Sequence, residues 1–149
     1  MTRKQMQKIL RRVSWYPPYL GAGIKIKSYD KDFTRFTVEM KLRWYNKNIY
    51  GTHFGGSLYA MSDPFFVFII LNYLGKEYVV WDKSAKIDFL KPGKGTVTSI
   101  FEISKEKLKS IKNEIDEIGK GTFFFKSEIK NEKDEVIAVT EKEIYVRKK

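Results

Sequence analysis

The chain of 149 residues carries a net charge of +11, from 29 Lys and Arg against 18 Asp and Glu. Its hydrophobic content of 42% and aromatic content of 15% exclude a disordered chain and predict a single domain over residues 1–149. Without cysteine it has no disulfide and no thiolate-bound metal, which favours a cytoplasmic protein. The charge favours anionic partners, but the basic residues are scattered among acidic and apolar neighbours, as on an ordinary solvated surface.

The first part of the chain predicts a helix followed by two strands. Apolar residues at helical spacing predict a short helix over about residues 4–13, which ends before Pro17 and Pro18 because proline disfavours helix in front of it. Strand-like sequence follows at 21–29. Residues 36–44 alternate apolar and polar side chains and predict a half-buried strand. The cationic N-terminus lacks the apolar run and cleavage site of a signal peptide.

The longest apolar segment of the chain comes next. A polar loop runs through Gly55 and Gly56 into this segment, and the pattern predicts one central helix over about residues 56–75. This helix is apolar on nearly all sides, so it must be buried on nearly all sides. Its most apolar part, Pro64–Leu74, is about half as long as a bilayer span, which predicts a core helix and no membrane span.

The remaining sequence alternates strands with one further helix. An apolar stripe predicts a helix over 105–118, capped by Ser104 and closed by Gly119. Strands are predicted at 77–90, 96–103, 121–130 and 135–146. This order of elements, with a helix that needs burial all round, predicts an α+β fold in which a curved antiparallel sheet wraps the central helix.

The polar loop and the start of the central helix carry a spaced motif. Its residues are Asn48, Gly51, Gly55, Gly56 and, farther along, Asp63. In this spacing they resemble the hotdog-fold acyl-CoA thioesterases of the phenylacetate-pathway type. The motif of that family is Asn-x-x-Gly-x-x-His-Gly-Gly, with an acidic residue on the helix nine positions after the histidine. The similarity covers roughly residues 21–146.

Two further segments refine this resemblance. The run 87–92, followed by Gly95, is similar to the family's next signature. The helix at 105–118 is more like an uncharacterised branch of hotdog proteins, a domain-of-unknown-function group with a provisional thioesterase label. The resemblance implies a hotdog fold, subunits paired as homodimers or dimers of dimers, and a small-molecule acyl thioester as partner. It implies no cofactor beyond the coenzyme A of the substrate itself.

The chain departs from the family at two positions. Phe54 occupies the place of the histidine, and the chain's only histidine, His53, lies one residue earlier. Val67 stands one turn after Asp63, where the family has a hydroxyl group. The pair His53-Phe54 is also similar to the His-Phe of hotdog hydroxyacyl dehydratases, whose acidic residue lies farther along. These departures leave open a non-catalytic acyl or acyl-CoA binding protein and, on the weaker match, a dehydratase-like enzyme.

The glycine pair has a chemical and a structural interpretation. Gly55 and Gly56 permit close backbone approach at a helix start, where unpaired amides can hold an anion. A thioester carbonyl becomes an oxyanion in the transition state, so these amides suit an oxyanion hole. Alternatively, the glycines only let the helix pack against the sheet. A triad of Ser57, His53 and Asp63 is a further option by analogy.

Asp63 is the candidate base or nucleophile. A lone carboxylate among apolar neighbours is costly unless partnered, and burial raises its pKa toward the range that a general base needs. The alternative is a structural carboxylate that bonds a neighbouring chain. Lys83 interrupts the apolar face of its strand; it either extends its ammonium group outward or faces the ligand, where it can pair with Asp63.

The spacing of Gly56 and Asp63 predicts a site shared by two subunits. Seven residues of helix separate them by about 10 Å, too far for both to act on one carbonyl group. We therefore expect an obligate dimer in which Gly56 of one subunit faces Asp63 of the other. The predicted catalytic residues are Asp63, Gly56 and His53, and the predicted substrate-binding residues are Asn48, Gly55, Ser57 and Lys83. No nucleic-acid partner is expected, because the aromatic residues lie mainly on apolar faces.

Overall fold

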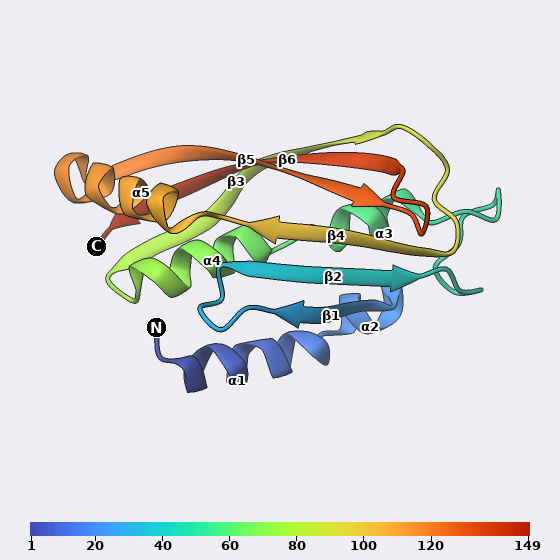
Figure 1. Ribbon diagram of the computed structural model, residues 1–149, viewed down its shortest axis with the longest axis horizontal. Coiled ribbons are helices and arrows are strands. Elements are labelled where there is room, and N and C mark those ends of the chain that lie inside the picture. Colours follow the sequence, from blue (N-terminus) through green and yellow to red (C-terminus); the bar gives the residue numbers. More distant parts are fainter.

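A strongly curved antiparallel sheet surrounds an apolar helix in the computed structural model, which describes every residue from 1 to 149 (Figure 1). The six strands lie in the order β1-β2-β4-β5-β6-β3. They are β1 Ile24–Tyr29, β2 Arg35–Lys41, β3 Tyr78–Phe89, β4 Thr96–Glu102, β5 Lys120–Lys130 and β6 Val136–Lys148. The predicted α+β fold, with a curved antiparallel sheet around a central helix, is confirmed.

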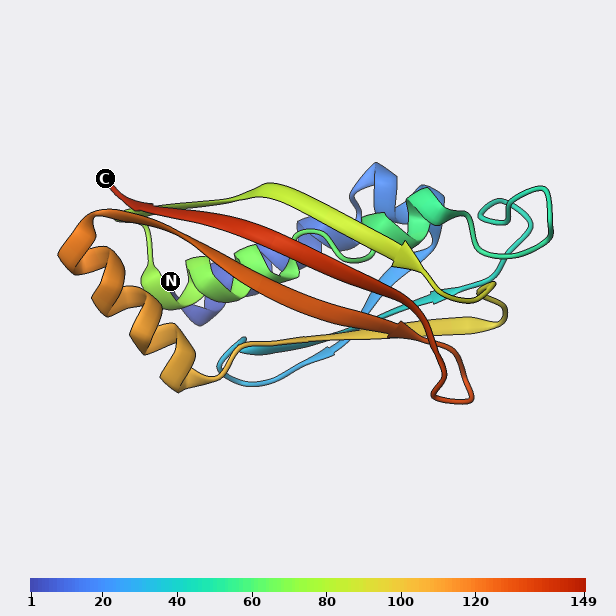
Figure 2. The ribbon, with the colours of Figure 1, turned by 90° about the horizontal axis from the view of Figure 1, so that it is seen from above.

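Five helices accompany the sheet. They are α1 Arg3–Ser14, α2 Pro17–Ala22, α3 Gly55–Ala60, α4 Phe65–Leu74 and α5 Lys105–Ile118. Figure 2 shows α4 enclosed between the two arms of the curved sheet, with α5 closing one end. The glycine loop and α3 lie at the other end (Figure 1). A candidate site at α3 is therefore near the open end of the sheet.

The central helix is broken, contrary to the predicted continuous helix over 56–75. Helix α3 ends at Ala60 and α4 begins at Phe65, with a turn over 61–64 between them. Proline has no amide hydrogen to donate to the preceding turn, so Pro64 ends the helical run and becomes the N-cap of α4. The break places Asp63 in a turn instead of on the side of a helix.

Helix α4 forms the centre of the hydrophobic core. Phe65, Ile69 and Ile70 are completely buried, and the ring of Phe65 stacks on Phe101 of β4 with 4.9 Å between centroids. By length and composition the stretch Gly55–Leu74, with a mean hydropathy of 1.3, would be able to cross a membrane. Its buried side chains identify it as a core element of this fold.

A β-bulge in β3 decides which of its side chains face the core. The pairing of β3 with β6 shifts between Asp82 and Ser84, so Lys83 is the extra residue. Before the bulge Val80 packs against the core, whereas Trp81 is 49% exposed and stacks on Tyr145. We predicted Trp81 on the apolar face; this is wrong because the extra residue shifts the alternation by one position.

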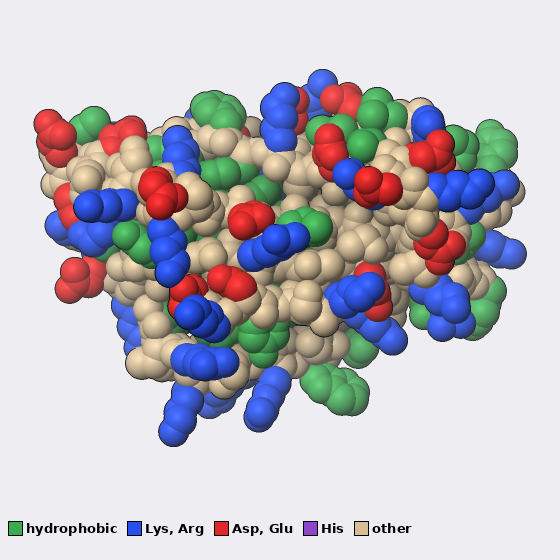
Figure 3. Space-filling view, viewed as in Figure 1, with side chains coloured by type: hydrophobic (Ala, Val, Ile, Leu, Met, Phe, Trp, Pro, Cys, Tyr) green, Lys and Arg blue, Asp and Glu red, His purple; other side chains and the backbone are tan.

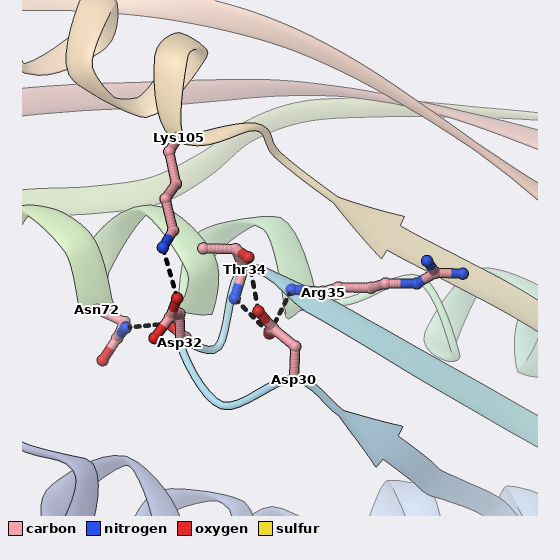
Figure 4. Close-up of polar contacts among 6 residues, drawn as sticks. All are labelled: Asp30, Asp32, Thr34, Arg35, Asn72 and Lys105. Atoms are coloured by element: carbon pink, nitrogen blue, oxygen red, sulfur yellow. Dashed lines mark hydrogen bonds and ion pairs between the residues drawn. The ribbon is translucent and has the colours of Figure 1, made fainter.

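Polar contacts fix the β1–β2 turn to α4 and α5 (Figure 4). The carboxylate of Asp30 accepts hydrogen bonds from the amide and hydroxyl of Thr34, at 2.7 and 2.8 Å. The carbonyl of Asp32 accepts from the side-chain amide of Asn72 at 3.1 Å, and its carboxylate pairs with Lys105 at 2.5 Å. These contacts fasten the end of the sheet that lies opposite the glycine loop.

Charges of both signs are interspersed on the face where β2 and β4 lie in front of α4 (Figure 3). Several are paired across neighbouring strands, as in Lys27–Glu39 at 3.2 Å and Lys126–Glu141 at 2.6 Å. Exposed pairs of this kind contribute little to stability. Basic and acidic side chains are therefore mixed on this face.

Candidate functional site

The glycine pair opens α3 as predicted. Gly55 and Gly56 are its first two residues, and Phe54 is the N-cap. Amides in the first turn of a helix have no acceptor inside it. Those of Ser57 and Leu58 donate to the carbonyl of Phe54 at 3.0 and 3.1 Å, whereas those of Gly55 and Gly56 make none of the hydrogen bonds outside the regular elements. The two glycine amides are therefore free to donate to a ligand.

Two phenyl rings lie directly on these glycines. A Cβ atom added to Gly55 would be 2.9 Å from Cζ of Phe89, and one added to Gly56 would be 2.5 Å from Cε1 of Phe54. Real Cβ atoms do not approach other atoms so closely, so the rings need glycine at both positions. Phe54 and Phe89 are 56% and 55% exposed, so each ring has solvent into which it can turn. Both glycines therefore pack against half-exposed rings, and this packing does not involve their amides.

Asn48 and His53 hold the loop that leads into α3. The side-chain oxygen of Asn48 accepts from the amides of Tyr50 and Thr52 at 3.0 and 3.1 Å, which closes an Asx-type turn. His53 is 3% exposed, and its Nε2 lies 3.0 Å from the carbonyl oxygen of Gly95. Burial lowers the pKa of His53, so the ring is neutral at pH 7 and donates from Nε2. Both side chains brace the loop in this protomer.

The structure does not assemble a triad from Ser57, His53 and Asp63. The only contact of the His53 ring nitrogens is with Gly95, and Nδ1 is buried without a partner. A hydroxyl group of Ser57 therefore has no base beside it within one protomer. We predicted that His53 orients substrate or water; its buried ring lines the cleft described below and connects the loop to the turn before β4.

A cleft of about 440 Å³ opens beside this loop. Its walls include Gly55, Leu58, Phe89 and Leu90, and Lys91 also lines it. Clefts with apolar walls and a few polar groups are typical ligand sites. This one offers an apolar surface for an acyl group and a cation beside it.

Asp63, Asp82 and Lys142 form a charged cluster at the break between α3 and α4. The side chain of Lys142, on the inner face of β6, is 1% exposed. Its Nζ lies 3.1 Å from Oδ2 of Asp82 and 3.7 Å from Oδ1 of Asp63, and the ring of Tyr59 covers it at 5.0 Å. A buried ammonium group needs negative charge close by, and the two carboxylates supply it.

Asp63 is not the lone carboxylate among apolar residues that we predicted. Its side chain is 49% exposed, and its charged neighbour is Lys142. The hydroxyl of Tyr19 donates to the backbone carbonyl of Asp63 and so fixes the turn. The carboxyl group with a raised pKa is that of Asp82, at about 6, because of burial first and the contact with Asp63 second, while Lys142 acts in the opposite direction.

The lysine beside Asp63 is therefore Lys142 and not Lys83. Because Lys83 is the extra residue of the bulge, its side chain points outward, is 55% exposed and pairs with Glu143 at 2.8 Å. The sequence analysis missed Lys142, although its strand contained the signal. The period of two places Lys142 on the same face as Ile144 and Val146, which are both completely buried.

The predicted site residues form two groups within one protomer. Gly55, Asn48 and His53 meet at the cleft, whereas Asp63 lies in the charged cluster. Gly56 is in the first turn of α3, and Asp63 lies beyond the end of this helix. The six residues of α3 span about 9 Å along the helix axis. The break removes the continuous helix assumed in the spacing argument but leaves the two groups at opposite ends of α3.

Comparison with known proteins gives one family and a set of similar structures. Residues 3–146 match the family described as Domain of unknown function (DUF4442). No curated protein matches the chain.

Three solved structures illustrate the fold. PA5026 of Pseudomonas aeruginosa, described as a protein of unknown function and probable thioesterase, is 16% identical, with a TM-score of 0.85 and 96% of each chain covered. OLEI01261 of Chlorobaculum tepidum, of unknown function, is 20% identical, with a TM-score of 0.79 over 99% of this chain and 98% of that one. The PaaI protein of the E. coli phenylacetic acid degradation operon is 17% identical, with a TM-score of 0.64 over 99% and 96%. These similarities confirm the hotdog fold.

Proposed function

Given that the chain belongs to the DUF4442 family and has the hotdog fold, we propose that it hydrolyses acyl-CoA thioesters. The observation that carries this proposal is the half-exposed carboxylate of Asp63, 3.7 Å from the buried ammonium group of Lys142 at the end of α3. Asp63 also stands at the acidic position of the thioesterase motif. The description of PA5026 as a probable thioesterase supports the same reaction class.

In the proposed reaction Asp63 is the general base. It removes a proton from water while the water oxygen bonds to the thioester carbon. The carbonyl oxygen becomes negative and accepts a hydrogen bond from the amide of Gly56. The carbon–sulfur bond then breaks, and the proton passes from Asp63 to the leaving sulfur. No metal is needed for these steps.

A second copy of the chain is part of this proposal. Gly56 and Asp63 lie at opposite ends of α3, so the amide that serves Asp63 comes from the other subunit. Strand β3 is an edge of the sheet and leaves Trp81 and Phe89 about half-exposed. A long edge strand with exposed apolar side chains favours pairing with another strand. Because Asp82 lies on β3, pairing along this edge brings the second subunit close to the charged cluster.

The substrate lies in the cleft, with its acyl group against Leu58, Phe89 and Leu90. Gly55 borders the thioester, with Ser57 two residues farther along α3, and Lys91 at the cleft binds a phosphate group of coenzyme A. Asn48 and His53 contribute by fixing the loop. The cysteine-free composition supports action in the cytoplasm.

A non-catalytic acyl-CoA binding protein is the second candidate, and one observation favours it. Phe54 occupies the histidine position of the motif, and its ring lies over Gly56. A ring that stays there keeps a carbonyl oxygen away from the amide. The cleft would then bind an acyl group without activating it.

A single assay separates these candidates. The release of free thiol from a panel of acyl-CoAs is measured for the natural chain and for Asp63→Asn. We expect turnover by the natural chain and a loss of about 100-fold or more in the variant, which is the usual contribution of a general base. Asp134→Asn is the matched control, since Asp134 is 85% exposed in the β5–β6 turn.

The other outcomes are equally decisive. Binding of acyl-CoA without turnover by both proteins identifies the binding protein. Turnover that Asp63→Asn leaves intact contradicts the assigned base. Absence of both binding and turnover contradicts both candidates.

A further inference from the structure

The charged cluster contains more negative charge than its single cation balances. Lys142 carries one positive charge, and Asp63 and Asp82 together carry two negative charges when both are ionised. The side chain of Lys142 is 1% exposed and that of Asp82 is 23% exposed, so solvent screens these two charges poorly, whereas Asp63 is 49% exposed. A single proton on the carboxylate pair would make the cluster neutral.

One oxygen atom shows where that proton fits. Oδ2 of Asp82 accepts from Lys142, whereas Oδ1 of Asp82 is buried and has no donor. An unsatisfied buried acceptor is costly, and native structures rarely keep one. Nζ of Lys142 lies close to both carboxylates, and the neighbouring Asp63 raises the pKa of Asp82, after the larger effect of burial. A proton on Asp82 would turn the unpaired acceptor into a donor toward Asp63.

We propose that Asp82 and Asp63 share one proton beside the buried ammonium group of Lys142, and that Asp82 and Lys142 are positioning residues that set the protonation state of Asp63. This inference rests on the proposed function only for its catalytic consequence. When the pair carries the proton, Asp82 donates a hydrogen bond to Asp63, which makes Asp63 a weaker base toward water. When the pair is fully ionised, Lys142 offsets its charge and Asp63 is ready as a base.

The three groups come from three different elements of the fold. Asp82 faces inward on β3 as the last residue before the bulge at Lys83, and Lys142 faces inward on β6. Asp63 comes from the turn after α3. The other titratable groups packed around them are Tyr59, whose ring covers Lys142, and Tyr19, whose hydroxyl donates to the carbonyl of Asp63. Burial raises the pKa of Tyr19, so its hydroxyl group stays neutral.

The test follows the carboxyl carbons of Asp63 and Asp82 by NMR in the full-length chain, between about pH 4 and about pH 8. We expect the carbon of Asp82 to titrate at its raised pKa of about 6, and the carbon of Asp63 to shift in the same step because the two groups share the proton. Asp82→Asn should abolish this shared step at Asp63. Lys142→Met should move it to higher pH by one unit or more, about tenfold in proton affinity, because two like charges then lack a cation.

Two controls keep the result interpretable. Lys142→Arg retains the charge and should leave a shared step, and Asp134→Asn, far from the cluster, should leave the step unchanged. Independent titration of Asp63 and Asp82 would overturn the proposal, as would a step that Asp82→Asn leaves intact. If Lys142→Met does not fold, as judged by circular dichroism, the Asp82→Asn titration decides alone.

The titration needs no substrate, so it tests the shared proton even if the protein hydrolyses no acyl-CoA. Where hydrolysis is observed, the pH profile gives a second readout that a purely structural role would not move. The rate of the natural chain should rise as pH increases through about 6, and Asp82→Asn should lose this rise. An unchanged pH profile in Asp82→Asn would contradict the positioning role.

Discussion

The Nζ atom of Lys142 lies 3.1 Å from Oδ2 of Asp82, although the two residues are 60 positions apart in the chain. Only 1% of the lysine side chain is exposed, so this contact replaces the water that an ammonium group normally keeps. The same nitrogen is the charged neighbour of Asp63. Stability and the candidate chemistry therefore depend on one buried cation.

Replacing Lys142 by methionine should destabilise the protein strongly. The change fills the same space but leaves Asp82 and Asp63 side by side without a cation, and breaking a buried pair on one side costs about 3 kcal/mol or more. Urea unfolding near neutral pH measures this loss. Lys83→Met is the matched control on the neighbouring strand: its pair with Glu143 is 55% exposed on the lysine side and should contribute less than about 1 kcal/mol. Equal losses in the two variants would contradict the burial of Lys142.

Asp82 should make stability fall as pH rises from about 4 to about 6. Its pKa in the folded state is about 6, raised from an ordinary value of 3.8, so between these values the folded chain binds more protons than the unfolded chain. Unfolding free energy then decreases with rising pH, and the effect is complete above the folded pKa. Urea unfolding at several pH values should show this slope in the natural chain and a flatter one in Asp82→Asn. Parallel curves for the two proteins would contradict it.

Gly56→Ala should separate the two interpretations of the glycine pair. The new methyl group displaces the ring of Phe54, which is 56% exposed and can turn into solvent, and alanine favours helix over glycine by up to about 1 kcal/mol. Stability should therefore change little. Alanine keeps the backbone amide but holds a methyl group where the Phe54 ring lies, and unlike the ring this methyl group cannot turn away. If the Gly56 amide serves as oxyanion donor, the methyl group therefore obstructs the carbonyl oxygen, and turnover should fall by about 100-fold.

Gly21→Ala in α2 is the control for this substitution, since a Cβ there meets nothing within 4 Å. It should leave both stability and turnover near those of the natural chain. A Gly56→Ala protein that unfolds more easily but retains turnover would show that the glycine serves packing alone.

Local sequence patterns predicted most of the fold, because they depend on neighbours along the chain. The alternation in β2 requires a strand with one buried face, and the apolar run of α4 requires a buried helix. The structure has both. The break at Pro64 had a local signal, since proline rarely lies inside a helix, but the apolar run on both sides favoured one continuous helix.

The charged cluster had no comparable local signal. The inward direction of Asp82 depends on a bulge that is defined only by the pairing of β3 with β6. Sequence alternation alone placed Lys83 on the inner face, and a single extra residue reversed that assignment. The contact of Lys142 with Asp82 is long-range, so it appears only when the register of the two strands is known. Site residues that lie on paired strands are therefore harder to predict than those in a motif along the chain.

The proposed two-subunit site requires a dimer at micromolar concentration in sedimentation velocity, with β3 at the interface. Trp81→Lys should weaken dimerisation, raising the dissociation constant of the dimer about tenfold or more, since charged side chains on edge strands oppose strand pairing. Trp81 is 49% exposed beside Tyr145, so the change should cost the monomer little. Phe124→Lys is the matched control, because Phe124 is 74% exposed on β5, which has strands on both sides. A natural chain that sediments as a monomer would remove the Gly56 amide from the reach of Asp63 and would contradict the proposed mechanism.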